Sequence, residues 1–179
     1  MPERVSLVVL CEDSLHQSFI YAFLNRMKLP AIGRLRVLPC ESKSKVFERF
    51  PIEVRALRRR HVRTQLVVVI DADELSDAQI RERLSQRLSD VGEDADFKKD
   101  PILIVRPRWE MENWALALLG NGIGEPRDQG ARGKVGDRTR DAGRVLADHC
   151  KVGDLPEDTL PSLKTACTEW AQFRRTWSF

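Results

Sequence analysis

The sequence predicts an α/β fold in which helices cover both faces of a four-stranded, mainly parallel, Rossmann-like sheet. Two observations lead to this expectation. Short apolar runs such as Val5–Cys11 and Gln65–Asp71 have the length and β-branched content of buried strands. Segments with apolar residues at helical spacing separate these runs. Strands that alternate with helices along a chain favour a parallel sheet with helices on its two faces.

Four strands and four helices are predicted in the first two thirds of the chain. The strands are Val5–Cys11, Leu35–Leu38, Gln65–Asp71 and Pro101–Val105. The helices cover about 14–27, 44–60, 76–88 and 109–119, with a break or kink at Pro51. Ser14 and Gln17 have the spacing of a capping box, and Ser76 is the expected cap of the third helix.

The remainder of the chain has a different composition. Seven of the ten glycines lie between Gly120 and Gly143, mixed with arginines. We therefore expect an α/β domain over 1–119, a Gly/Arg-rich loop over 120–137 and a small C-terminal helical extension over 138–179. The extension is expected to hold helices near 139–150 and 160–176, the second carrying Trp170 and Phe173.

Composition excludes several protein classes. The 179 residues contain 30 Lys+Arg and 27 Asp+Glu, a net charge of +3, and 42% are hydrophobic, which argues against intrinsic disorder. No apolar run approaches the roughly 20 residues that span a bilayer, and no signal peptide is recognisable, so a cytoplasmic protein without a membrane partner is expected. Four widely separated cysteines and three histidines argue against a zinc site and predict free thiols.

Acidic residues follow the first and third predicted strands. Glu12 comes after the first, and Asp71 and Asp73 come after the third. If these strands are neighbours in the sheet, the carboxylates meet at one edge, where α/β proteins place their ligands. Oxygen ligands of this kind suit Mg²⁺ or Mn²⁺. The alternative is that the acids only end the strands and cap the helices that follow.

At these positions the sequence resembles the Toprim (topoisomerase–primase) domain. Glu12 matches the Glu that ends the first strand of that family, and Asp71 with Asp73 matches its Asp-x-Asp motif. The stretch from Arg106 to Leu116, with Glu112 and Trp114, is similar to a branch of small Toprim-like proteins. That branch is related to the overcoming-lysogenization-defect nucleases and is often encoded beside an AAA-type ATPase in phage-defence loci. The resemblance covers about residues 5–119.

The resemblance implies a metal-dependent nuclease. Asp71 and Asp73 would hold Mg²⁺, and Glu12 would share the metal or act as general acid/base. Glu112 is a further catalytic candidate, although a glutamate on a helix surface is often only solvated. The sequence departs from the family at Asp13, where a glycine is usual. The extra carboxylate could bind a second ion, or it could mark a site that has lost activity.

Basic residues near this edge are candidates for binding phosphate. Arg106 and Arg108 follow the fourth strand, and Arg132 and Lys134 lie in the Gly-rich segment, which could equally be a solvated linker. A further basic run closes the second helix, with five arginines within 55–63. It exceeds what stabilisation of a helix C-terminus requires, so an anionic partner such as nucleic acid is expected.

Two other functions fit part of the pattern. A strand followed by Asp-x-Asp is also the first motif of haloacid-dehalogenase-type phosphatases, but Leu75 stands where their threonine is expected and Glu12 is left without a role. The second alternative is a non-catalytic subunit that keeps the acidic residues only as part of the fold. DNA or RNA as the substrate, the activation trigger and homo-oligomer formation are left open by the sequence.

Overall fold

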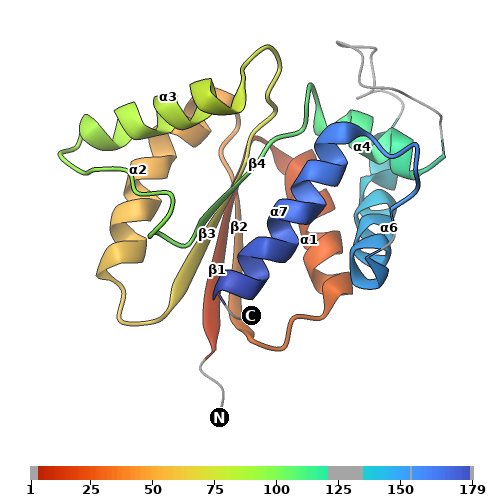
Figure 1. The fold of residues 1–179 in the computed structure, drawn as a ribbon, viewed down its shortest axis with the longest axis horizontal. Coiled ribbons are helices and arrows are strands. Elements are labelled where there is room, and N and C mark those ends of the chain that lie inside the picture. Colours follow the sequence, from red (N-terminus) through yellow and green to blue (C-terminus); the bar gives the residue numbers. More distant parts are fainter. Residues whose placement is uncertain (1–3, 121–134, 154, 178–179) are drawn as a thin grey trace.

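The computed structural model describes residues 4–120, 135–153 and 155–177. Its strands are β1 (Val5–Cys11), β2 (Ile32–Pro39), β3 (Thr64–Val69) and β4 (Ile102–Val105). They form one sheet in the order β2-β1-β3-β4, and every neighbouring pair is parallel (Figure 1). The predicted α/β class is therefore confirmed, and β1 and β3 are neighbours.

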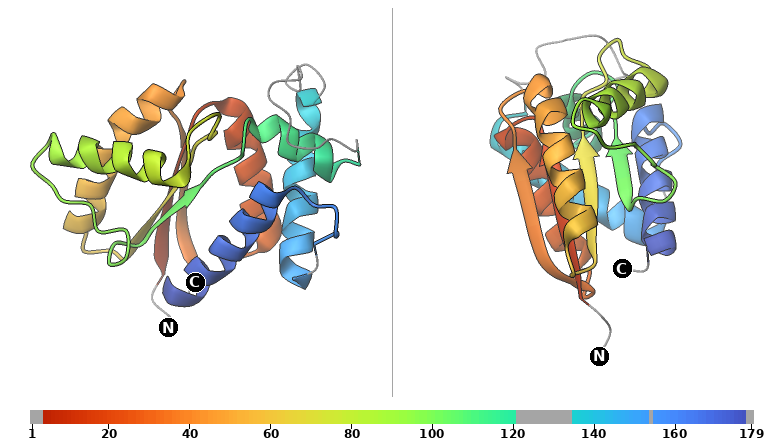
Figure 2. Two further views of the ribbon diagram at one scale, coloured as in Figure 1. Left: turned by 45° about the horizontal axis from the view of Figure 1, so that its top comes forward. Right: turned by 90° about the vertical axis from the view of Figure 1, so that its left-hand side faces the viewer.

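Helices cover both faces of this sheet. Their bounds are α1 (Ser14–Met27), α2 (Lys43–Arg59), α3 (Asp77–Ser89), α4 (Met111–Leu118), α6 (Thr139–Val152) and α7 (Pro161–Trp177), with a 3₁₀ turn η1 at Gly136–Arg138. Helices α2 and α3 lie on one side of the sheet, and α1, α4, α6 and α7 lie on the other (Figures 1 and 2). The chain is thus a three-layer structure.

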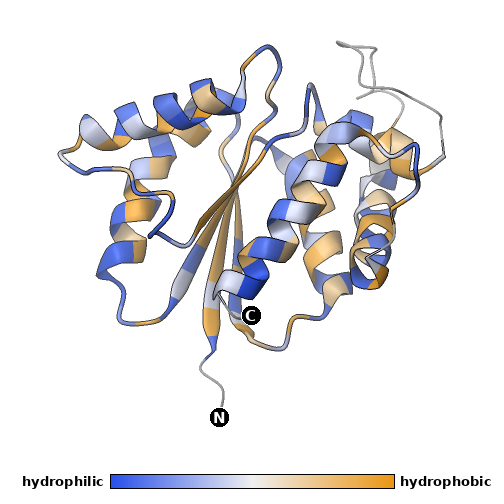
Figure 3. Ribbon diagram, in the orientation of Figure 1, coloured by the Kyte–Doolittle hydropathy of each residue, from blue (hydrophilic) through white to orange (hydrophobic). Residues whose placement is uncertain are grey.

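The alternation of side chains along the strands divides the core between the two faces. In β1, Leu7 and Val9 pack toward α1, whereas Val8 and Leu10 pack toward α2. All four are buried because β1 is an inner strand with helices on both sides, and the strands are accordingly the apolar centre of Figure 3. Trp170 of α7 belongs to the same cluster as Leu7. The C-terminal helices therefore complete one layer of the main core.

The α1 and α6 helices approach each other unusually closely. A Cβ atom added at Gly143 of α6 would lie 2.4 Å from the backbone oxygen of Phe19 in α1. Only a residue without a side chain allows this distance. The contact fixes α6 against α1 although the two helices are far apart in the sequence.

The capping box predicted at Ser14 and Gln17 was wrong, the cap predicted at Ser76 was right, and the break considered at Pro51 does not occur. Asp13, and not the Ser14–Gln17 pair, caps α1, because its carboxylate accepts the N–H groups of Leu15 and His16. Helix α2 continues through Pro51, whose ring is buried with the apolar face of that helix. Burial of this face outweighs the lost hydrogen bond. The cap at Ser76 is confirmed, as a full capping box with Gln79.

No helix within the described ranges combines the length and the apolar character that crossing a lipid bilayer requires.

Candidate functional site

The acidic residues of β1 and β3 come together because these strands are neighbours. The side chain of Glu12 reaches across to the end of β3, where its Oε1 accepts the backbone N–H of Asp71 at 2.9 Å. Asp71 itself is only 8% exposed. The topology thus places Glu12 against the backbone of Asp71, with the two carboxyl groups near enough to interact electrostatically, at the carboxyl edge of the sheet, where ligands of such folds bind.

Burial and the nearby Asp71 change the pKa of Glu12. Burial, followed by the negative charge of Asp71, raises the pKa of Glu12 from 4.5 to about 7. The hydrogen bond from the backbone and the positive charges of His16 and Lys43 oppose this rise without cancelling it. Glu12 therefore changes its charge near neutral pH, unlike a glutamate in water.

A buried histidine that the sequence did not single out lies at the centre of the site. His16 is 2% exposed and lies in the first turn of α1. Its Nδ1 is 2.9 Å from Asp13 Oδ1, and its Nε2 is 3.1 Å from Asp71 Oδ1. Both ring nitrogens face carboxylate oxygens, so the doubly protonated imidazolium satisfies both acceptors.

The carboxylates also set the charge of His16. Burial alone would lower the pKa of this imidazole, but hydrogen bonds to Asp13 and Asp71 and the charges of both raise it to about 10. His16 is consequently a cation at neutral pH. It acts as a counter-ion built into the site, linking the start of α1 to the end of β3.

Asp73 is held by a second cation. The ammonium group of Lys43, the first residue of α2, bonds to Asp73 Oδ2. The backbone of Asp73 has a φ of +50°, the left-handed region that non-glycine residues seldom adopt. This conformation turns the chain sharply after β3, and the Asp73 side chain stays 55% exposed.

The three predicted carboxylates have different contacts. Glu12 and Asp71 lie side by side, whereas the Asp73 carboxylate is engaged by Lys43. In the part of the chain that the structure describes, no three His, Cys, Asp or Glu side chains are grouped so that they could hold a metal ion. Mg²⁺ needs only one or two carboxylates beside water and substrate oxygens, so Glu12 and Asp71 still form a fitting donor set.

Glu112 and Trp114 are both buried in α4. Glu112 is 4% exposed, so it is not the solvated surface glutamate that the sequence allowed. Its catalytic role stays a prediction. Trp114 is 2% exposed, and its Nε1 donates to Ser162 Oγ at 2.7 Å, which confirms the expected core position.

The residues predicted to bind phosphate behave differently from one another. Arg106 is already paired internally, with Asp77 Oδ1 at 3.0 Å and Glu169 Oε1 at 2.7 Å, and its side chain is 12% exposed. The guanidinium of Arg108 lies 5.2 Å from the ring centre of Trp109. Of the pair, Arg108 is the better candidate for a phosphate contact. Arg132 and Lys134 lie outside the described residues.

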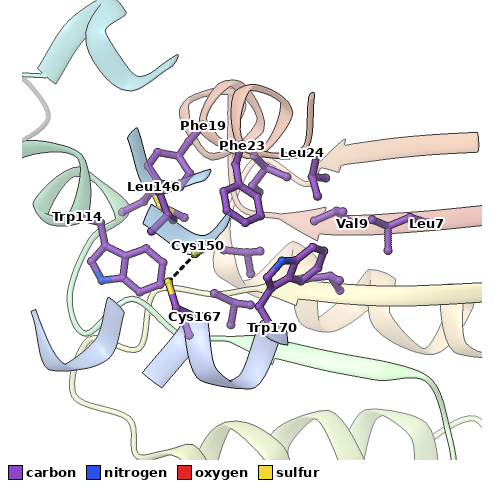
Figure 4. Close-up of a pocket in the computed structure, with 16 residues that line it drawn as sticks. Leu7, Val9, Phe19, Phe23, Leu24, Trp114, Leu146, Cys150, Cys167 and Trp170 are labelled. Carbon is purple, nitrogen blue, oxygen red and sulfur yellow. Dashed lines mark hydrogen bonds between the residues drawn. The ribbon is translucent and has the colours of Figure 1, made fainter. Parts of the chain in front are cut away.

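An apolar cavity of about 70 Å³ lies away from these carboxylates, between the sheet and the helices α1, α4, α6 and α7 (Figure 4). The sulfur atoms of Cys150 and Cys167 are 2.9 Å apart at its wall, and Trp114 and Trp170 also line it. All four cysteines of the chain are free, as predicted. The lining contains no charged residue, so the cavity is a packing feature of the core.

Comparisons of the chain with protein-family models, with curated proteins and with solved structures found no match.

Sequence reasoning missed the two cations of the site for different reasons. Asp13 and His16 are three residues apart across a helix start, a spacing at which side chains meet, so their pairing was open to prediction. The contacts from His16 to Asp71 and from Lys43 to Asp73 depend on the sheet order and carry no local signal.

Proposed function

We propose that the protein is a Mg²⁺- or Mn²⁺-dependent nuclease that cleaves phosphodiester bonds of DNA or RNA. The observation that carries the proposal is the placement of Glu12 and Asp71 side by side on adjacent parallel strands. Outside a ligand site, two neighbouring carboxylates repel each other, and a divalent cation removes that repulsion. The resemblance to Toprim domains adds the reaction class.

Each residue of the site has a distinct task in this proposal. Asp71 and one oxygen of Glu12 would hold the metal, which on binding polarises the phosphodiester and stabilises its developing negative charge. His16 donates to Asp71 and fixes the orientation of that carboxylate. Alternatively, Glu12 leaves the metal to Asp71 and acts as general acid/base, taking up or releasing a proton at the reacting oxygens. Asp73 would join the donor set only if Lys43, which pairs with it, were released.

The test is cleavage of labelled single- and double-stranded DNA and RNA, with Mg²⁺ or Mn²⁺ and with EDTA. Asp71→Asn should reduce cleavage by roughly 10²-fold or more while the fold is retained, and Glu12→Gln by a similar factor. Asp141→Asn is the matched control, because Asp141 is an exposed carboxylate on α6 paired only with a neighbouring arginine among the described residues. Wild-type cleavage by Asp71→Asn would contradict the proposal.

A second candidate, a non-catalytic nucleic-acid-binding subunit, is favoured by one observation. His16 and Lys43 already place two positive charges against the carboxylates, which reduces the need for a metal ion. Nucleic-acid binding without cleavage in any divalent cation would support this candidate. Hydrolysis of a small phosphomonoester without cleavage of polymers would instead support the haloacid-dehalogenase-type phosphatase.

The cellular setting is proposed from the resemblance alone. We infer a cytoplasmic role in phage defence with an AAA-type ATPase as partner protein. The corresponding test is whether the nuclease activity depends on such an ATPase and on ATP when both proteins are expressed together. Equal activity with and without the ATPase would argue for an independent enzyme.

A further inference from the structure

A strongly basic pocket lies at the opposite end of the sheet from the carboxylates. Its volume is about 670 Å³, within the range of ligand sites. Five arginines and one histidine line it, and no carboxylate does. These residues are Arg4, Arg34, Arg36, Arg59, Arg60 and His61. They come from the chain before β1, from β2 and from the end of α2, the elements that meet at the lower end of the molecule in Figure 1.

The alternation of side chains along β2 directs two of these arginines to one face. Leu35 and Val37 pack into the cluster on the α1 side of the sheet. Arg34 and Arg36 alternate with them and therefore lie on the α2 side, next to Ser6 and Val8 of β1. This is the edge strand, so its arginines reach solvent without displacing core residues.

A glycine next to these arginines makes room for the stem of Arg4. A Cβ atom added at Gly33 would lie 2.7 Å from Arg4 Cβ and 2.9 Å from Arg4 Cδ. The Arg4 side chain thus packs directly on the backbone of β2. The register shift between Val5 and Ser6 occurs at the same place, so the local backbone irregularity is part of the pocket wall.

The basic run at the end of α2 divides into two groups in space. Arg55 and Arg58 pair with Glu93, and Arg58 also pairs with Asp100. Arg59 and Arg60 instead line the pocket. The sequence indicated an excess of positive charge over what the helix end needs, and the structure places that excess in the pocket.

Most arginines of the pocket have no ion-pair partner among the described residues. Over residues 4–120, 135–153 and 155–177, none of Arg4, Arg34, Arg36 and Arg59 has an ion-pair partner. Arg60 has a single distant one, with a Glu53 oxygen at 3.7 Å. Clustered like charges repel, and that repulsion ends when a polyanion binds.

The lining of the pocket favours one class of polyanion. Five guanidinium groups exceed what a single phosphate can accept, whereas each can bind a separate phosphate of a chain with two hydrogen bonds. No Phe, Tyr or Trp side chain lines the pocket and His61 supplies its single ring, so the lining favours contacts to phosphate over stacking of bases. Contacts of this type hold a nucleic-acid backbone independently of its sequence.

We propose that this basic pocket binds the phosphate backbone of nucleic acid, at a second site separate from the carboxylates. Ser6 in the pocket and Glu12 are six positions apart along and just beyond β1, which corresponds to about 20 Å along an extended strand. Binding here stands independently of cleavage, and it extends the proposed nuclease function by supplying an anchor for the substrate on the far side of the sheet.

The experiment measures binding by fluorescence anisotropy of labelled 20-nucleotide DNA and RNA, in EDTA and over a series of salt concentrations. We expect Arg34→Ala/Arg36→Ala to weaken binding by roughly tenfold or more and to lower the salt slope by about 1 to 2. Arg140→Ala/Arg144→Ala on the exposed side of α6 removes the same charge and should bind as the wild type does.

A second variant changes the geometry of the pocket without changing the net charge of the protein. Gly33→Ala leaves the charge unchanged but displaces Arg4, so it should weaken binding several-fold. Circular dichroism and thermal unfolding establish that each variant is folded. Wild-type affinity and salt slope in Arg34→Ala/Arg36→Ala would overturn the proposal. Binding of inorganic tripolyphosphate without binding of either oligonucleotide would also overturn it, in favour of a small polyphosphate ligand.

Because EDTA is present, the binding experiment is blind to catalysis. Asp71→Asn should bind as tightly as the wild type does in this assay. Loss of cleavage in Asp71→Asn together with retained binding supports both proposals. Normal cleavage in Asp71→Asn together with binding that depends on Arg34 and Arg36 rejects only the proposed catalytic site.

Discussion

The two ends of the parallel sheet differ in whether their charged side chains have partners of opposite charge within the protein. At the carboxyl end, His16 and Lys43 lie against the carboxylates and neutralise part of their charge within the protein. At the amino end, arginines such as Arg34 and Arg36 gather without a carboxylate in the pocket. The net charge of +3 hides this separation. Buried charges require internal partners, whereas solvent-facing ones can remain available for an external ligand.

The largest expected effect concerns His16, and it tests whether the carboxyl end depends on its internal cation. His16→Ala leaves Asp13 and Asp71 facing each other without the imidazolium, so we expect a loss of about 3–5 kcal/mol in unfolding free energy at pH 7 in EDTA. Urea unfolding followed by circular dichroism measures it. His61→Ala, at an exposed histidine of the amino end, is the control with little effect. If His16→Ala lowered the unfolding free energy by less than about 1 kcal/mol, the carboxyl end would not depend on its internal cation.

The next prediction concerns pH and Glu12. Because the pKa of Glu12 rises from 4.5 to about 7 on folding, the folded protein binds more protons than the unfolded chain between these values. The unfolding free energy in EDTA should therefore fall by about 1–3 kcal/mol as pH rises through this window.

Glu12→Gln should remove that fall below pH 6.5. The variant should keep the fall in unfolding free energy between pH 6.5 and about 10. In this range His16 has lost its proton in the unfolded chain but still holds it in the folded protein. Glu82→Gln on the exposed side of α3 is the matched control and should keep the wild-type profile. A profile of Glu12→Gln that follows the wild type from pH 4.5 to 6.5 would show that Glu12 does not titrate there.

A smaller effect on stability is expected when Lys43 is replaced. This replacement tests whether an internal cation at the carboxyl end competes with a metal ion. Lys43→Met should lower the unfolding free energy by at most about 1 kcal/mol, because Asp73 is half exposed. The same change should strengthen Mg²⁺ binding roughly three- to tenfold, measured by calorimetric titration. Lys45→Met, at an exposed lysine of the same helix, is the control. Unchanged Mg²⁺ affinity would show that Lys43 and the metal do not share a site.

The smallest effect is expected at the amino end. Arg34→Ala/Arg36→Ala should change the unfolding free energy by less than about 0.5 kcal/mol, and at low salt the change should be stabilising because repulsion falls. Chemical unfolding at low and high salt measures it. A loss of more than about 2 kcal/mol would show that these arginines support the fold and are not kept for a ligand.

The sequence predicts most of the fold because local patterns agree with the tertiary structure. Continuous apolar runs identify β1 and β3, and Ser76 with Gln79 identifies the start of α3. The prediction is weakest at β2, which is twice as long as the four residues expected. Arg34 and Arg36 interrupt its apolar pattern because it is an edge strand with one face partly open to solvent.

The site is predictable only in part. The position of Glu12 and Asp71 follows from the adjacency of β1 and β3, which the sequence analysis could state only as a condition. The engagement of Arg106 by Glu169 does not, because the two residues are 63 positions apart and meet only when α7 packs beside β4. Partners of this kind decide whether an arginine near a site can bind a ligand, and they are set by tertiary packing.

Asp13 has a consequence for how this sequence can change over evolution. The residue caps α1 and also holds His16, so one carboxylate serves helix start and site together. Replacement by glycine would remove both contributions at once, whereas a change at His16 alone would leave Asp13 and Asp71 in conflict. Positions 13 and 16 are therefore expected to be inherited as a pair. A glycine at position 13 should accompany a residue other than histidine at position 16, and such chains would form a distinguishable lineage.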